Sequence, residues 1–182
     1  MLGYSQLLLG FISALVLVWP GTWMVRYIAP RIGLLDIPNV RSSHSGPIPR
    51  AGGLVFVLIA PLVAMVIAHR AGISLARGEW ALLVSGWFIA SVSLIDDWRP
   101  LPARVRLVAQ VWAALGLILY GRYLRYFGAG GFGVIDVGWL GVLITFVWIL
   151  GMANAFNFMD GMDGLAAGQG LIAALAVAWL SM

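Results

Sequence analysis

Six long stretches of this sequence contain no charged residue, and the five short segments between them hold all of the charge. A helix of about 20 mainly apolar residues spans a bilayer, and a backbone in lipid has to satisfy its own hydrogen bonds. We therefore expect an all-α, polytopic membrane helix bundle of about six transmembrane helices, forming a single transmembrane domain over residues 1–182. The expected spans are residues 1–25, 51–68, 80–95, 107–121, 137–153 and 165–182.

The composition agrees with a membrane protein and excludes several other classes. Hydrophobic residues make up 62% of the chain and charged residues only 10%, whereas about 25% of a soluble domain is charged. This excludes an ordinary soluble globule, and the high apolar content excludes a disordered chain. The chain has no cysteine, so it is not a disulfide scaffold. The first stretch is too long for a signal peptide and has no basic segment before it.

The distribution of arginine gives an orientation in the membrane. All eleven basic residues are Arg; the first, third and fifth connecting segments hold seven of them, and the second and fourth hold four. Basic segments stay in the cytoplasm, so we expect the odd-numbered segments there and the N-terminus outside. Arginine also suits phosphate recognition, although codon bias explains the absence of lysine as well. The chain has no basic stripe of the kind that would bind nucleic acid.

The acidic residues gather on the same side of the expected membrane. Five of the seven lie in the segments expected in the cytoplasm. Carboxylates next to a bilayer are costly and mark a functional site by default. A channel or transporter would instead place its acids at mid-membrane depth, which argues against that class. The five acids are Asp36, Asp96, Asp97, Asp160 and Asp163.

The fifth connecting segment, residues 154–164, carries polar side chains at every third position. On a helix, Asn154, Asn157 and Asp160 lie within one face of about 120°, and Asp163 continues the spacing. Amide and carboxylate oxygens are the ligands that Mg²⁺ prefers, usually shared with a substrate diphosphate. The alternative is that these residues only cap a helix at the membrane exit.

The third connecting segment contains two adjacent acids, Asp96 and Asp97, directly after an apolar stretch. Adjacent residues on a helix point about 100° apart, so one acid can serve a metal while the other accepts a proton. Close carboxylates also raise one another's pKa, which suits a general base. Arg99, Arg104 and Arg106 follow, either to neutralise phosphate or simply to anchor the helix ends at the membrane surface.

The first connecting segment is rich in Pro and Gly, which predicts an ordered loop with several turns rather than a helix. Arg41, His44 and Arg50 in this loop are candidates for phosphate contact, although a single loop His is usually only solvated. In the fourth segment, the glycine-rich residues 128–133 predict a flexible external loop.

Three segments together resemble the polyprenyl-phosphate N-acetylhexosamine-1-phosphate transferases. They are GLLDIPNVRSSHSGPIPRAGG (33–53), LIDDWRP (94–100) and NAFNFMDGMDGLAAG (154–168). The third is the most specific, and the first resembles the branch that initiates O-antigen synthesis more than the peptidoglycan translocase. The resemblance implies transfer of a sugar 1-phosphate from a UDP-N-acetyl sugar to undecaprenyl phosphate, with release of UMP, in O-antigen-like envelope synthesis.

The same resemblance implies a location, a cofactor and residue roles. The site is expected on the cytoplasmic face of the bacterial inner membrane, with Mg²⁺ as cofactor and Mn²⁺ as the alternative. Asp96 is expected as base or as partner of the acceptor phosphate, with Asp97 as the second catalytic acid, and Asp160 and Asp163 at the metal. The expected substrate-binding residues are Asn154, Asn157, His44, Arg50 and Arg41.

This sequence departs from the family pattern in two ways. Pro100 stands where the paired-acid motif often has a third acid, and the resemblance covers roughly the N-terminal half of the family. We therefore expect the chain to be incomplete relative to the family, and inactive or weakly active alone. The alternative function is a catalytically inactive homologue that binds polyprenyl phosphate or a partner subunit. The sequence leaves a homodimer open and does not identify the sugar.

Overall fold

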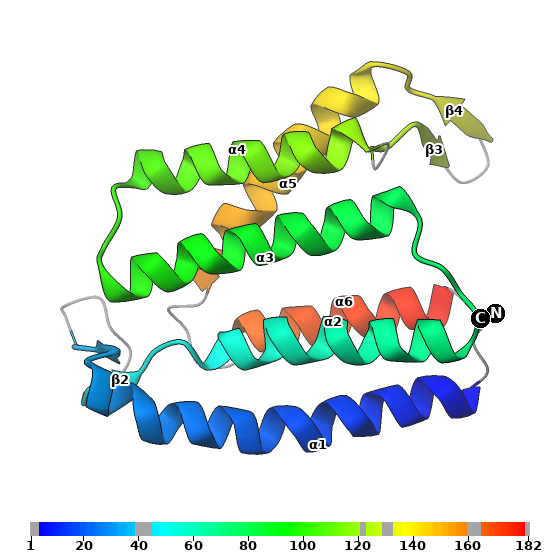
Figure 1. Ribbon diagram of the computed structural model, residues 1–182. Coiled ribbons are helices and arrows are strands. Elements are labelled where there is room, and N and C mark those ends of the chain that lie inside the picture. Colours follow the sequence, from blue (N-terminus) through cyan, green and yellow to red (C-terminus); the bar gives the residue numbers. More distant parts are fainter. Residues whose placement is uncertain (1–3, 39–44, 121–122, 129–132, 160–164, 181–182) are drawn as a thin grey trace.

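The computed structural model describes residues 4–38, 45–120, 123–128, 133–159 and 165–180, and this part contains six α-helices (Figure 1). A 3-10 helix, η1, and four strands of two or three residues make up its other regular structure. The α-helices are α1 Tyr4–Ile28, α2 Gly52–Arg70, α3 Arg77–Trp98, α4 Ala103–Leu119, α5 Leu140–Met159 and α6 Leu165–Leu180. The shorter elements are η1 Ala29–Ile32, β1 Leu35–Asp36, β2 Ile48–Pro49, β3 Tyr126–Gly128 and β4 Val134–Asp136.

The helices have the length and polarity of membrane helices. Within the described residues, four helical segments are long and apolar enough to cross a bilayer, namely Ser5–Ile32, Gly52–Arg70, Arg77–Trp98 and Leu140–Met159. The other two helices are shorter, with 17 residues in α4 and 16 in α6. Large apolar side chains are exposed on most helices, including Phe11 and Trp148 at 66% each. Helices that are apolar all round are typical of membrane spans, so the expectation of an all-α membrane bundle is confirmed.

Consecutive helices run in opposite directions and pack side by side through small residues. α1 packs along α2, α3 along α4, and α4 along α5. Ala109, Ala113 and Ala114 of α4 are buried, and a side chain on Gly21 would lie 2.5 Å from Cγ1 of Val55. Membrane helices associate through such small residues because they allow close approach of the backbones.

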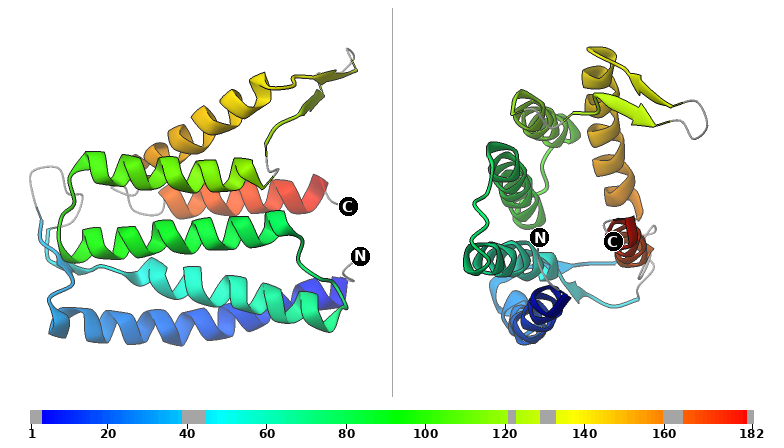
Figure 2. Two further views of the ribbon diagram at one scale, coloured as in Figure 1. Left: turned by 45° about the horizontal axis from the view of Figure 1, so that its top comes forward. Right: turned by 90° about the vertical axis from the view of Figure 1, so that its right-hand side faces the viewer.

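The up-and-down topology brings the three segments with chemical motifs to one end of the bundle (Figures 1 and 2). η1, β1 and β2 lie there, together with the turn between α3 and α4, the last turn of α5 and the first turn of α6. The described ends of the chain lie at the opposite end. We call the end that carries the three motif segments the motif end. The connecting segments found at the motif end are the odd-numbered ones, which agrees with the expectation that these segments share one side of the membrane.

Several helices extend further than the sequence predicted. α3 continues to Trp98, so Asp96 and Asp97 lie in its last turn and not in a loop. It ends there because Pro100 disfavours helical geometry at Arg99, whose φ of −140° is extended. α5 continues to Met159, six residues beyond the expected end at residue 153. The prediction that the paired acids follow the end of the helix was therefore wrong, whereas α5 continues through the residues that the spacing had placed on one helical face.

The fourth connecting segment carries two short strands in its described part. The flexible external loop expected over residues 128–133 lies largely outside the described residues, and only Gly128 of it lies in a strand, β3. β3 and β4 pair in antiparallel register, with Tyr126 opposite Asp136 and Gly128 opposite Val134. Arg125 adds an ion pair with Asp136 at 3.7 Å. Aromatic and β-branched residues such as those of β3 and β4 favour strands. The glycines between the two strands in the sequence favoured the prediction of a loop instead.

The base of this hairpin is attached to the first turns of α5. The Leu124 N–H donates to Oγ1 of Thr145 at 2.8 Å, and that hydroxyl donates to the Gly141 carbonyl at 2.7 Å. A side chain on Gly141 would overlap the carbonyl oxygen of Leu124. The close contact between the hairpin and α5 therefore requires glycine at position 141.

We expect Gly141→Ala to destabilise the protein, because the new methyl group forces the hairpin away from α5. Overpacking of this kind costs about 1–3 kcal/mol. The measurement is the midpoint of thermal unfolding in detergent, followed by size-exclusion chromatography. Gly151→Ala is the matched control, because Gly151 lies in the same helix and its added methyl would meet no atom within 4 Å. Equal midpoints for the two variants would contradict the contact.

Candidate active site at the motif end

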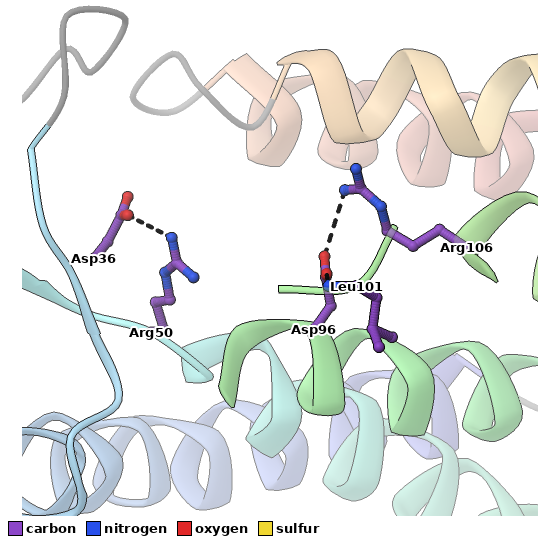
Figure 3. A network of polar contacts seen from close by, with 5 residues as sticks. All are labelled: Asp36, Arg50, Asp96, Leu101 and Arg106. Carbon is purple, nitrogen blue, oxygen red and sulfur yellow. Dashed lines mark hydrogen bonds and ion pairs between the residues drawn. The ribbon is translucent and has the colours of Figure 1, made fainter. Parts of the chain in front are cut away.

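Asp96 is held by two contacts at the motif end (Figure 3). Its Oδ1 accepts the Leu101 backbone N–H at 2.6 Å, and its Oδ2 accepts from Nη1 of Arg106 at 3.4 Å. The carboxylate therefore stabilises the turn between α3 and α4 and contacts a guanidinium at the start of α4. The Asp96 side chain is 24% exposed and that of Arg106 is 40% exposed. A half-buried carboxylate held in this way is preorganised, and its neighbouring cation still reaches solvent.

Asp97 follows Asp96 in the last turn of α3 and is half-buried. The helical geometry that the structure shows here separates the two side chains by about 100°. The two acids therefore point in different directions, which fits the expectation of separate tasks. Of the three arginines near the turn, Arg106 is the one that contacts Asp96, whereas Arg104 is exposed.

Arg50 forms an ion pair with Asp36 at 2.5 Å within the β1–β2 ribbon. The Arg50 backbone N–H also donates to the Leu34 carbonyl at 3.0 Å, so both ends of this residue hold the loop together. Figure 3 draws this pair and the Asp96–Arg106 pair in one view. The sequence singled out Asp36 only as one of five acids on one side of the membrane, because a partner 14 residues away gives no local signal.

Asn154 lies on α5 and contacts α4 through its side chain. Its Nδ2 donates to Oε1 of Gln110 at 2.8 Å and to the Leu150 carbonyl at 2.8 Å. Asn157 follows on the same helix and is exposed. These two amides therefore lie on a helix as expected, whereas the contact with Gln110 was not predicted. The available signal was an amide inside an apolar stretch, four residues after Arg106.

The remaining predicted residues lie outside the described part of the chain. These are Arg41 and His44, between β1 and β2, and Asp160 and Asp163, between α5 and α6. Among the described residues, no group of three or more His, Cys, Asp or Glu side chains could hold a metal ion. The structure thus brings Asp96, Asp97, Arg50 and the two amides to one end of the bundle, and the expected metal ligands stay predictions.

Comparison with known proteins supports the resemblance. The model of glycosyl transferase family 4 matches residues 79–182. This chain belongs to that family. The match includes the paired acids, Arg106, Gln110 and the two asparagines of α5.

Three curated relatives of the family 4 chain illustrate the similarity. Decaprenyl-phosphate N-acetylglucosaminephosphotransferase of Mycobacterium tuberculosis is 35% identical over 97% of the chain and 46% of the relative. A probable undecaprenyl-phosphate N-acetylglucosaminyl 1-phosphate transferase of Bacillus subtilis is 32% identical over 97% and 49%. Phospho-N-acetylmuramoyl-pentapeptide-transferase of Lactobacillus delbrueckii subsp. bulgaricus is 30% identical over 93% and 56%. The chain thus spans about half the length of these relatives, and no solved structure matches it.

Proposed function

We propose that this family 4 chain carries a site that transfers a sugar 1-phosphate from a UDP-N-acetylhexosamine to undecaprenyl phosphate and releases UMP. The observation that carries the proposal is the motif end, where Asp96 is fixed between the Leu101 N–H and Arg106. The names of the relatives support the reaction class. They also make N-acetylglucosamine the first sugar to test.

The chemistry fits the end of a membrane helix bundle. A phosphate oxygen of the lipid acceptor attacks the phosphorus that bears the sugar, and the bond from that phosphorus to the oxygen of UMP breaks. The donor is charged and soluble, whereas the acceptor is a lipid, so the two meet at the membrane surface. Catalysis of phosphoryl transfer consists mostly of positioning and charge neutralisation. Asp96 serves as base or electrostatic partner of the acceptor phosphate, and Arg106 supplies positive charge beside it.

Magnesium is part of the proposal. Asp160 and Asp163 are the proposed ligands, and Asn154 and Asn157 orient them; all of these groups offer oxygen atoms, which suit Mg²⁺ and also Mn²⁺. When bound, the ion neutralises charge on the diphosphate as the bond to UMP breaks. We also propose that His44 and Arg41 contact phosphate. Arg50 contributes indirectly, through its ion pair with Asp36.

We place this site on the cytoplasmic face of a bacterial inner membrane, where it initiates an O-antigen-like envelope polysaccharide. The excess of arginine in the segments at the motif end supports this orientation. The two acids outside these segments are Glu79 in the second connecting segment and Asp136 in the fourth.

Single cysteines test the orientation cleanly, because the chain has none of its own. Ser45 at the motif end and Ser74 at the opposite end are both exposed. In right-side-out spheroplasts, we expect a membrane-impermeant maleimide to label Ser74→Cys and to label Ser45→Cys only after permeabilisation. The reverse pattern would invert the orientation and contradict a cytoplasmic motif end.

The reaction itself is tested by UMP release from UDP-N-acetylglucosamine in liposomes that contain undecaprenyl phosphate and Mg²⁺. Because the chain spans about half of its relatives, the assay uses the chain alone and the chain joined to the C-terminal half of the Bacillus subtilis relative. The second candidate function is an inactive homologue that binds polyprenyl phosphate or a partner subunit. It predicts binding of the lipid without release of UMP in either form.

A further inference from the structure

A polar contact joins the half-buried Gln110 of α4 to the exposed Asn154 of α5, in the apolar part of the helices. Oε1 of Gln110 accepts from Nδ2 of Asn154 at 2.8 Å. Gln110 lies seven residues into α4, within a stretch of the sequence that has no charge, and Asn154 lies five residues before the end of α5. Amide side chains in a membrane bond across helices because lipid offers them no partner. This contact therefore fixes the two helices at a defined depth and rotation.

The same face of α4 also contacts α3. Arg106 and Gln110 are four residues apart, and residues at this spacing are neighbours on a helix surface. Arg106 reaches Asp96 at the end of α3, and Gln110 reaches Asn154 near the end of α5. One face of α4 thus contacts both helices that carry the proposed catalytic and metal-binding motifs.

We propose that Gln110 is a positioning residue that sets the rotation of the last turns of α5 relative to Asp96. Asn157 lies one turn beyond Asn154 on α5, so the rotation that Gln110 imposes on Asn154 also sets the direction of Asn157. Gln110 itself contacts no reacting group in this account. The effect on rate rests on the proposed function, whereas the effect on helix geometry does not.

Two substitutions distinguish the effect of losing the acceptor oxygen of Gln110 from the effect of changing the shape of its side chain. Gln110→Met keeps a similar length but replaces the amide with a thioether, which is a weak acceptor. Gln110→Glu keeps a carboxyl oxygen that can accept from Asn154. Gln169→Met is the matched control, because Gln169 is exposed on α6. We expect Met at position 110 to loosen the arrangement of α4 and α5, Glu to restore it, and the control to behave like the unsubstituted chain.

The primary measurement is a distance between spin labels, which does not depend on activity. Labels are attached to Val105→Cys on α4 and Phe158→Cys on α5, both exposed positions near the motif end, in a chain without other cysteines. In monodisperse protein in lipid nanodiscs, we expect Gln110→Met to broaden or shift the distance distribution and Gln110→Glu to return it to the original form. Identical distributions in all variants would overturn the proposal.

The second measurement is the rate of UMP release in the form of the protein that is active. We expect Gln110→Met to lower kcat about tenfold, with KM for undecaprenyl phosphate changed less than about twofold. Gln110→Glu should recover kcat to within about threefold. Altered distances with an unchanged kcat would overturn the positioning role. Absence of UMP release in every variant would instead count against the proposed function, while the distances would still decide the contact between the helices.

Discussion

Replacing Asp96 with asparagine is expected to lower the rate of UMP release about a hundredfold. The change removes the negative charge beside the proposed acceptor phosphate but retains Oδ1, which accepts the Leu101 N–H at 2.6 Å. The turn between α3 and α4 therefore keeps its hydrogen bond, and the loss falls on the chemistry rather than on the fold. A hundredfold loss corresponds to about 2.7 kcal/mol of transition-state stabilisation.

The matched control is Asp136→Asn, which removes the same charge at the opposite end of the bundle. Asp136 accepts the Gly138 N–H at 2.8 Å and pairs weakly with Arg125. We expect its rate to stay within about twofold of the unsubstituted protein. Unfolding midpoints of both variants establish that neither has lost its fold. A rate for Asp96→Asn close to that of Asp136→Asn would exclude Asp96 from the reaction.

Replacing Arg106 with glutamine is expected to lower kcat/KM for undecaprenyl phosphate about thirtyfold, the second-largest effect. Arg106 lies 3.4 Å from Oδ2 of Asp96, a long contact for a charged pair, and its side chain is 40% exposed. An incoming phosphate can therefore compete with the carboxylate for the guanidinium. Arginine presents several donors in a planar fork that matches phosphate. Arg106→Lys keeps the charge without the fork and is expected to retain an intermediate rate.

Arg104→Gln is the matched comparison for this prediction. It removes the same charge from the same helical turn, but Arg104 is exposed and Arg106 contacts Asp96. We expect Arg104→Gln to lower kcat/KM less than threefold. Equal losses in the two variants would mean that α4 contributes only a general positive charge at the membrane surface.

The helices could be predicted from the sequence because the membrane imposes a simple rule. Uncharged stretches of 15 residues or more had to be helical in lipid, and all six overlap helices. The clustering of the motif segments also followed, because successive spans alternate in direction. The helix ends could not be placed in the same way. Asp96 and Asp97 were assigned to a connecting segment, yet both lie in the last turn of α3.

The contacts within the candidate site depend on packing that the sequence does not display. The pairing of Gln110 with Asn154 joins residues 44 positions apart, and that of Arg50 with Asp36 joins residues 14 apart. Neither pair follows from local spacing. The pairing of β3 with β4 was missed for a similar reason, because strands of three residues each leave little pattern in the sequence. Sequence therefore predicted which residues meet at one end, but not which atoms bond.

The most direct test of the central claim is the balance between UMP and lipid product. Radiolabelled UDP-N-acetylglucosamine is supplied to liposomes that contain undecaprenyl phosphate and either the chain alone or the chain joined to the C-terminal half of the Bacillus subtilis relative. We predict equimolar UMP and undecaprenyl-diphospho-sugar in at least one form. Both products should depend on Mg²⁺, disappear on chelation and be lost in Asp96→Asn. If neither product forms with either protein although undecaprenyl phosphate still binds, the proposed transfer is contradicted and the inactive homologue is favoured.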